Sequence, residues 1–230
     1  MWKDVPLTIK IGGHLFAKDG VDLQQLRSIA NVIRECHDGN DRWAVVVGGG
    51  EPARLYIEAA RELGADEARC DEIAIAVTRV HATLMLLALG DLVYPEVVRD
   101  VGELRRALAV RPIAVTGGFW PGQSTFAVAA LCAEATGSDR LVMATNVRGL
   151  YDRDPRRYPD AKLIEEITYD ELMEFLARTS HAAGEYRMID SVGLTVLKRS
   201  KIRLLIVDGR SPESIRRAIL YNEAGTVVRP

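Results

Sequence analysis

The chain has 230 residues, of which 48% are hydrophobic and 27% are charged, and its formal net charge is −2. This length and apolar content suit one large domain or two small lobes with a filled core. The near-neutral charge argues against nucleic-acid binding through a strongly basic face and leaves only a local basic patch open.

The segment "MWKDVPLTIK" lacks the apolar stretch of a signal peptide, and no apolar run is expected to reach the roughly 18 residues that span a membrane. The three cysteines are odd in number and widely spaced, which favours reduced core thiols. A cytoplasmic protein is therefore expected.

Short β-branched runs alternate along the chain with longer helical patterns, which is typical of α/β proteins. Strands are expected at residues 7–11, 43–47, 112–116, 140–145, 203–207 and 226–228. Helices are expected at residues 22–36, 51–63, 71–89, 100–109, 124–136, 168–177, 188–200 and 212–221, and a proline-rich polar loop at 152–160. Asp22 and Asp71 are candidate N-caps. The pattern predicts an all-parallel sheet with helices on both faces.

Three glycine clusters each follow a predicted strand: "IGGH" (11–14), "VGGGEPA" (47–53) and "TGGFWPGQS" (116–124). Glycine lets backbone N–H groups approach an anion, and the N-terminus of a following helix adds its positive dipole. Any single cluster is also compatible with a plain tight turn. Because open α/β sheets bind ligands at the carboxyl ends of their strands, the three clusters together indicate a phosphate-binding edge.

Two well-known phosphate motifs fit these clusters poorly. Residues 47–53 match G-x-G-x-x-A, but that fingerprint belongs to the first βα unit, and the acidic residue at the right distance, Asp71, opens a predicted helix. Residues 117–124 have P-loop spacing, but Gln123 replaces the lysine and Pro121 removes a backbone donor. The remaining N–H groups of this loop suit one phosphate, and Phe119 and Trp120 suit packing against a flat ring.

Five segments, in family order, resemble the amino-acid-kinase family and, within it, the archaeal UMP kinases of the crenarchaeal branch. They are residues 10–13, 45–85, 116–135, 144–164 and 199–209, and together they run along nearly the whole chain. The pair "GGG-x-x-AR-x-YI" and "GGF-x-PGQST" is the most specific part. The resemblance implies a three-layer αβα sandwich with a mainly parallel sheet, which transfers the γ-phosphoryl group of ATP to UMP with Mg²⁺ and gives UDP in pyrimidine biosynthesis. It also implies a homohexamer built from dimers, with no nucleic-acid or membrane partner.

The resemblance implies a single domain over residues 1–230. The part before about residue 140 would mainly bind the phosphoryl acceptor, and the part after it would mainly bind ATP. Lys10 would be catalytic. The ATP side would comprise Lys10, Gly12, Gly13, His14, Gly50, Arg54, Thr145, Tyr151 and Asp154. The UMP side would comprise Gly49, Asp71, Phe119, Trp120, Pro121, Gly122, Gln123, Ser124 and Thr125, with Asp71 on the ribose. No protein metal ligand is implied.

Physical chemistry supports some of these assignments and leaves others open. Lys10 lies in an apolar strand, where an unpaired charge is unfavourable, so a functional role is expected. Phosphoryl transfer needs positioning and positive charge, which Lys10, the glycine N–H groups and Mg²⁺ would supply. Arg54 is equally compatible with an ion pair to Glu58, and Asp71 with a helix cap. His81 is expected to be a packed or interface histidine.

The chain departs from the family pattern at four places. Phe126 and Arg148 stand where relatives commonly carry Asp, Thr195 where a basic residue is usual, and His14 where Ser or Lys is usual. Lys198 and Arg199 are candidates to supply the charge missing at position 195. These departures keep two alternatives open: a kinase of the same fold that acts on another acceptor, such as isopentenyl phosphate or a carboxylate, and a non-catalytic nucleotide-binding regulator.

Overall fold

In the computed structural model the described residues are 5–18, 20–153, 155, 157–179 and 189–230. Their central feature is a seven-stranded sheet with strand order β3-β2-β1-β4-β8-β9-β7. The strands are β1 Leu7–Ile11, β2 Trp43–Val47, β3 Ile113–Thr116, β4 Arg140–Thr145, β7 Glu166–Thr168, β8 Arg203–Asp208 and β9 Thr226–Arg229. The block from β3 to β8 is parallel, whereas β9 pairs antiparallel with β8. The sheet is therefore mainly parallel, as the resemblance implies, and the all-parallel sheet that the strand pattern alone predicts is wrong at this edge.

Helices cover both faces of the sheet, and each face has its own core. The helices are α1 Leu23–Cys36, α2 Gly50–Glu62, α3 Glu67–Leu89, α4 Val101–Val110, α5 Thr125–Thr136, α6 Tyr169–Thr179, α7 Ser191–Arg199 and α8 Pro212–Tyr221. One core joins one face of the strands to α4, α5, α6 and α7, and the other joins the opposite face to α1, α3 and α8. Successive strand residues alternate between these cores: Val46 belongs to the first and Val45 to the second. The result is the expected three-layer αβα sandwich.

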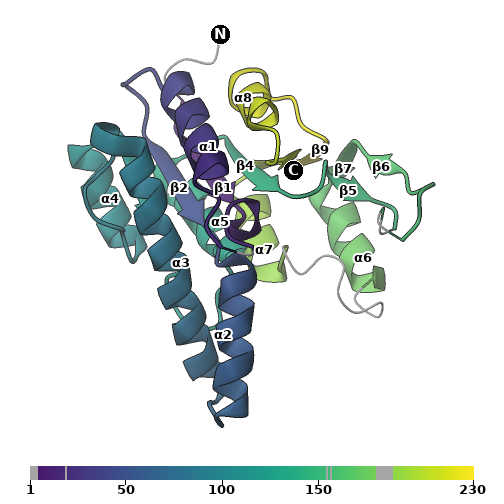
Figure 1. Ribbon diagram of the computed structural model, residues 1–230. Helices are drawn as coiled ribbons and strands as arrows, with labels where there is room; N and C mark the ends of the chain where they lie inside the picture. Colours follow the sequence, from purple (N-terminus) through teal and green to yellow (C-terminus); the bar gives the residue numbers. More distant parts are fainter. Residues whose placement is uncertain (1–4, 19, 154, 156, 180–188) are drawn as a thin grey trace.

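Smaller elements complete the described chain. Short 3₁₀ turns lie at Gly13–Leu15 and Gly90–Leu92, and strands β5 (Leu150–Tyr151) and β6 (Leu163–Ile164) pair in a separate two-stranded sheet. This small sheet and α6 lie at one end of the molecule, opposite α4, while α2 and α3 project side by side beyond the central sheet (Figure 1). The three cysteines are free thiols.

The start of α3 differs from the expectation. The helix begins at Glu67, and its N-cap is Asp66, whose Oδ1 accepts a hydrogen bond from the N–H of Arg69 at 2.8 Å. Asp71 lies inside the first turns, so its predicted role as the cap is wrong. The cap of α1 is confirmed, because Asp22 accepts from the N–H of Gln25 at 2.9 Å. Each carboxylate satisfies one of the free N–H groups at the start of its helix.

Helix α3 is more apolar than expected from the sequence. An 18-residue window within residues 67–92 reaches a mean hydropathy of 1.8, which by length and composition is enough to cross a membrane, and 33% of that window is buried inside the protein. The expectation that no run has this length is therefore wrong. The buried side of α3 packs against α1, β2 and β3, whereas Val80 and Leu87 are exposed. When a helix has one face in the core and apolar residues on the other, the exposed apolar face is typical of a surface that contacts another molecule.

Candidate active site

The carboxyl ends of the parallel strands bring the glycine turns to one edge of the sheet. Gly12 N–H donates to the carbonyl of Ala144 at 3.0 Å, and Gly48 N–H donates to the carbonyl of Ile11 at 2.9 Å. A Cβ atom on Gly13 would lie 2.3 Å from the carbonyl oxygen of Gly48, so only glycine allows the first two turns to approach this closely. The turns after β1 and β2 thus form one continuous backbone surface, as anion binding at a sheet edge requires.

The backbone of Gly50 has the left-handed conformation, with φ of 62°, and opens α2. A Cβ atom there would meet Gly13 and His14 backbone atoms at 2.7 Å. The glycine turn after β2 is also fixed by helix α3, because Nδ1 of buried His81 bonds to the carbonyl oxygen of Gly48 at 3.0 Å. A carbonyl only accepts, so this nitrogen carries the proton. His81 also packs edge-on against Phe16, which confirms that it is a packed histidine.

Lys10 lies in the middle of this arrangement, one residue before the end of β1. Its side chain is only 5% exposed, and burial lowers its pKa from 10.5 to about 8. In the sheet Lys10 stands beside Val46 and Met143, and no described carboxylate forms an ion pair with it. A buried cation without a counter-ion is unfavourable unless an anionic ligand arrives. Lys10 therefore fits a phosphate-binding role.

The third glycine turn, residues 117–124, lies against α3. Asp71 Oδ2 accepts from the N–H of Gly122 at 2.7 Å, and Nη2 of Arg79 donates to the carbonyl of Phe119 at 3.2 Å. Between them, the N–H of Gly118 donates to the hydroxyl of Thr78 at 2.7 Å. We call residues 117–124 the acceptor loop, after the role that the resemblance implies for them. The structure brings Asp71 to this loop.

The side chains of the acceptor loop differ in how exposed they are to solvent and in whether their polar atoms have hydrogen-bond partners. Phe119 is 4% exposed and packs in the core, so most of its ring is covered within the protein. Trp120 is 63% exposed. Gln123 is half-buried, and its Oε1 has no hydrogen-bond partner among the described atoms. Trp120 is thus open to solvent, whereas Gln123 has a buried acceptor atom that no described donor satisfies.

The acceptor loop ends at the N-terminus of α5. The Ser124 hydroxyl caps this helix by accepting from the N–H groups of Phe126 and Ala127 at 3.0 and 3.1 Å. The same hydroxyl donates a short hydrogen bond to Asp190, which in turn caps α7 by accepting from Gly193 N–H at 2.8 Å. Two helix N-termini therefore point toward the loop end, where their dipoles favour an anion.

The predicted ATP-side residues lie around the same edge. The carbonyl of buried Thr145, at the end of β4, accepts from Gly209 N–H at 2.7 Å, and Tyr151 lies in β5. Arg54 is exposed on α2 and pairs with Glu51 at 3.2 Å, so the expected alternative partner, Glu58, is wrong. The ring of His14 folds back over Gly12, where a Cβ atom would lie 2.6 Å from Cε1. Asp154 lies outside the described residues.

The departures from the family pattern have clear structural settings. Phe126 is buried in the core against Gly193 of α7, where a Cβ atom would come within 2.5 Å of the ring. The hydroxyl of Thr195 bonds within α7 to the carbonyl of Ser191 at 2.7 Å. The candidate substitutes for a basic residue at this position are both paired: Lys198 with Asp170 at 2.5 Å and Arg199 with Glu134 at 2.6 Å. Neither is therefore available to replace the missing charge.

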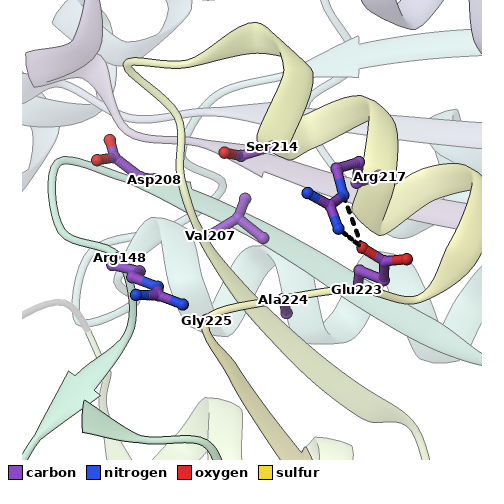
Figure 2. Close-up of a pocket in the computed structure, with 8 residues that line it drawn as sticks. All are labelled: Arg148, Val207, Asp208, Ser214, Arg217, Glu223, Ala224 and Gly225. Atoms are coloured by element: carbon purple, nitrogen blue, oxygen red, sulfur yellow. Dashed lines mark hydrogen bonds and ion pairs between the residues drawn. The ribbon is translucent and has the colours of Figure 1, made fainter.

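Arg148 lines a pocket at the carboxyl end of β8. Figure 2 shows its guanidinium beside Gly225, with the ion pair between Arg217 and Glu223 across the pocket. The Nε–Oε2 distance in that pair is 2.6 Å. A Cβ atom on Gly225 would overlap the carbonyl oxygen of Arg148 at 1.8 Å, so glycine is required for this contact. Arg148 thus lies in a pocket beside the carboxyl end of β8, and it carries positive charge where an aspartate would carry negative charge.

Two polar residues of this site were missed from the sequence, Thr78 and Asp190. Thr78 lies seven residues after Asp71, two helical turns further along the same face, and this spacing was a usable signal. Asp190 precedes a predicted helix, so it was recognisable as a cap but not as a partner of Ser124.

No group of three His, Cys, Asp or Glu side chains in the described ranges could hold a metal ion.

Residues 7–208 match the model of the amino acid kinase family, and the chain belongs to that family. Its curated relatives include the uridylate kinase of Methanothermobacter thermautotrophicus, 44% identical over 97% of this chain and 99% of the relative. The uridylate kinase of Methanobrevibacter smithii is 40% identical over 96% of this chain and 98% of the relative. The crystal structure of uridylate kinase from Archaeoglobus fulgidus superposes with a TM-score of 0.85 at 33% identity, covering 96% of this chain and 99% of that one. The structure of UMP kinase from Ureaplasma parvum, at 20% identity and a TM-score of 0.79, supports the fold alone.

Proposed function

We propose that this protein transfers the γ-phosphoryl group of ATP to UMP and forms UDP, a step of pyrimidine nucleotide biosynthesis in the cytoplasm. The observation that carries the proposal is Lys10, buried without a carboxylate partner at the edge where the glycine turns meet. The uridylate kinases to which the chain is similar over almost its full length supply the choice of substrate.

The site residues suit a reaction that depends on positioning and positive charge. Lys10 and the N–H groups of Gly13 and Gly50 would hold the ATP phosphates, and Gly12, whose N–H is bonded to Ala144, would line the same side. Mg²⁺ bound to those phosphates would neutralise further charge. The phosphate of UMP is already anionic at pH 7, so no general base is needed. Bound phosphates favour the charged form of Lys10 and raise its pKa above the value of about 8 in the free protein.

The two substrates would approach from opposite sides of Lys10, ATP mainly over the chain after about residue 140 and UMP mainly over the chain before it. His14, Arg54, Thr145, Tyr151 and Asp154 would complete the ATP side. Gly49, Asp71 and residues 119–125 would form the UMP side, with α3 behind them.

The first test is substrate choice. With ATP and Mg²⁺, the purified protein is expected to phosphorylate UMP with a higher kcat/KM than CMP, AMP or GMP in a coupled assay. Equal rates for all four nucleotides would reject the assignment of the acceptor, and isopentenyl phosphate in the same assay covers the alternative acceptor. Nucleotide binding without turnover of any acceptor would make the protein a regulator.

We also propose that the protein is a homo-oligomer, most simply a hexamer built from dimers that join through α2 and α3. The large apolar side chains exposed on these two helices are Leu55, Tyr56, Val80 and Leu87, and Leu63, the C-cap residue of α2, is exposed beside them. Burial of such side chains against a second copy is favourable by about 25 cal/mol per Å². Light scattering at micromolar concentration is expected to show an assembly that Val80→Glu and Leu87→Glu together weaken. A monomeric wild-type protein would contradict the proposal.

A further inference from the structure

Thr78 is a buried hydroxyl residue of α3 that faces the acceptor loop. Its side chain is 5% exposed. The hydroxyl donates to the carbonyl of Ile75 at 2.7 Å and accepts from the N–H of Gly118 at 2.7 Å. One hydroxyl therefore joins the helix backbone to the loop backbone, and its only proton is used within the helix.

The loop is fitted tightly around this hydroxyl. A Cβ atom on Gly117 would lie 2.4 Å from Thr78 Oγ1 and 2.8 Å from the Thr78 carbonyl carbon. The methyl group of Thr78 faces the second glycine turn, 3.4 Å from a Cβ atom placed on Gly49. Thr78 thus touches the backbones of both turns that the proposed function assigns to UMP.

The other two bonds between α3 and the loop are more accessible. Asp71 and Arg79 are both only half-buried, and Asp71 bonds to Gly122 in a part of the loop that is open to solvent. Water competes with such bonds, whereas the buried N–H of Gly118 has no other protein partner among the described residues. Loss of the Thr78 hydroxyl would therefore leave the N–H of Gly118 without a hydrogen-bond partner.

We propose that Thr78 is a positioning residue for the acceptor: its hydroxyl fixes Gly118 and, through it, the loop that receives UMP. It acts on acceptor affinity without touching the ATP side. This inference rests on the proposed function, because that function makes residues 117–124 the UMP loop.

The test compares Thr78→Val, which removes the hydroxyl and keeps the shape, with Thr78→Ser, which keeps the hydroxyl. Thr83→Val is the matched control, since the Thr83 hydroxyl bonds only to the carbonyl of Arg79, at 2.9 Å, on the exposed side of the same helix. Thr78→Val is expected to raise the KM for UMP about tenfold, with kcat and the KM for ATP within about twofold of wild type. Thr78→Ser and Thr83→Val are expected to keep the wild-type KM for UMP.

A second measurement does not depend on turnover. In hydrogen–deuterium exchange, the peptide over residues 117–124 is expected to exchange faster in Thr78→Val than in wild type, while residues 43–48 stay unchanged. If wild type fails to phosphorylate UMP, the proposed function falls, and exchange still decides whether Thr78 holds the loop. If wild type is active and Thr78→Val matches it in UMP affinity, the positioning role is rejected. Equal increases in both KM values, or a KM increase shared by Thr83→Val, would also reject it.

Discussion

Replacing Lys10 by methionine is expected to lower kcat for UMP phosphorylation about 10²–10³-fold, the usual effect of removing one preorganised electrostatic stabiliser. The KM for UMP is expected to change less, because a charge that binds the moving phosphoryl group contributes mainly in the transition state. Methionine has a similar length and fits an apolar strand between Val46 and Met143.

The same substitution is expected to stabilise the free protein. Burial lowers the pKa of Lys10 from 10.5 to about 8, so the folded state binds this proton less tightly than the unfolded state. Below pH 8 the full penalty is present, about 3 kcal/mol, and it disappears as the pH rises from about 8 to 10.5. The gain in the free energy of unfolding of Lys10→Met over wild type is therefore largest at pH 7 and small near pH 10.5.

Denaturant unfolding at pH 7 and pH 10, at one protein concentration, measures this difference beside the kinetics. Lys198→Met is the control, because Lys198 is half-exposed at the far end of α7 and paired with Asp170. It is expected to change neither kcat nor the pH dependence of stability. An active Lys10→Met enzyme would assign the lysine to structure alone.

Asp71→Ala is expected to raise the KM for UMP roughly ten- to a hundred-fold, because hydrogen bonds to a charged group contribute about 1.5–3 kcal/mol. If Asp71 binds the ribose, the variant also loses preference for UMP over deoxy-UMP. If it only holds Gly122 through the 2.7 Å bond, affinity falls and the preference stays. Measuring the KM for both nucleotides separates these roles.

Asp66→Ala provides a matched control on the same helix. Asp66 is the true cap of α3, so its loss is expected to reduce stability by about 1 kcal/mol and to leave both KM values unchanged. A result in which Asp71→Ala behaves like Asp66→Ala, with a lower melting temperature and unaltered UMP affinity, would remove Asp71 from the site.

The alternation of strands and helices was predictable because each buried strand is a short β-branched run and each helix has its own apolar spacing. Strands β5, β6 and β7 were not, since two or three residues are too few to show a period. The direction of β9 depends on the turn that leads into it, which the three residues Thr226, Val227 and Val228 do not encode. Asp66 and Asp71 both suit a cap, and only the backbone shows which one accepts the hydrogen bond.

The site was predictable where it depends on local chemistry and less so where it depends on packing. A lysine in an apolar strand and glycines after strands are visible in one sequence. The burial of Phe119, the contact of Phe126 with Gly193 and the bond from Ser124 to Asp190 each join segments far apart in the chain. Such contacts follow from the folded geometry rather than from spacing.

Helix α3 has two distinct faces. One is hydrogen-bonded to the acceptor loop, and the other carries exposed apolar residues. A shift of this helix cannot be confined to either side, because a helix moves as a rigid rod. Anything that seats or unseats a second copy on α3 would therefore be felt at Gly118 and Gly122. In a cell, the affinity of each subunit for its nucleotide would then depend on the concentration of the enzyme, and dilution would lower that affinity.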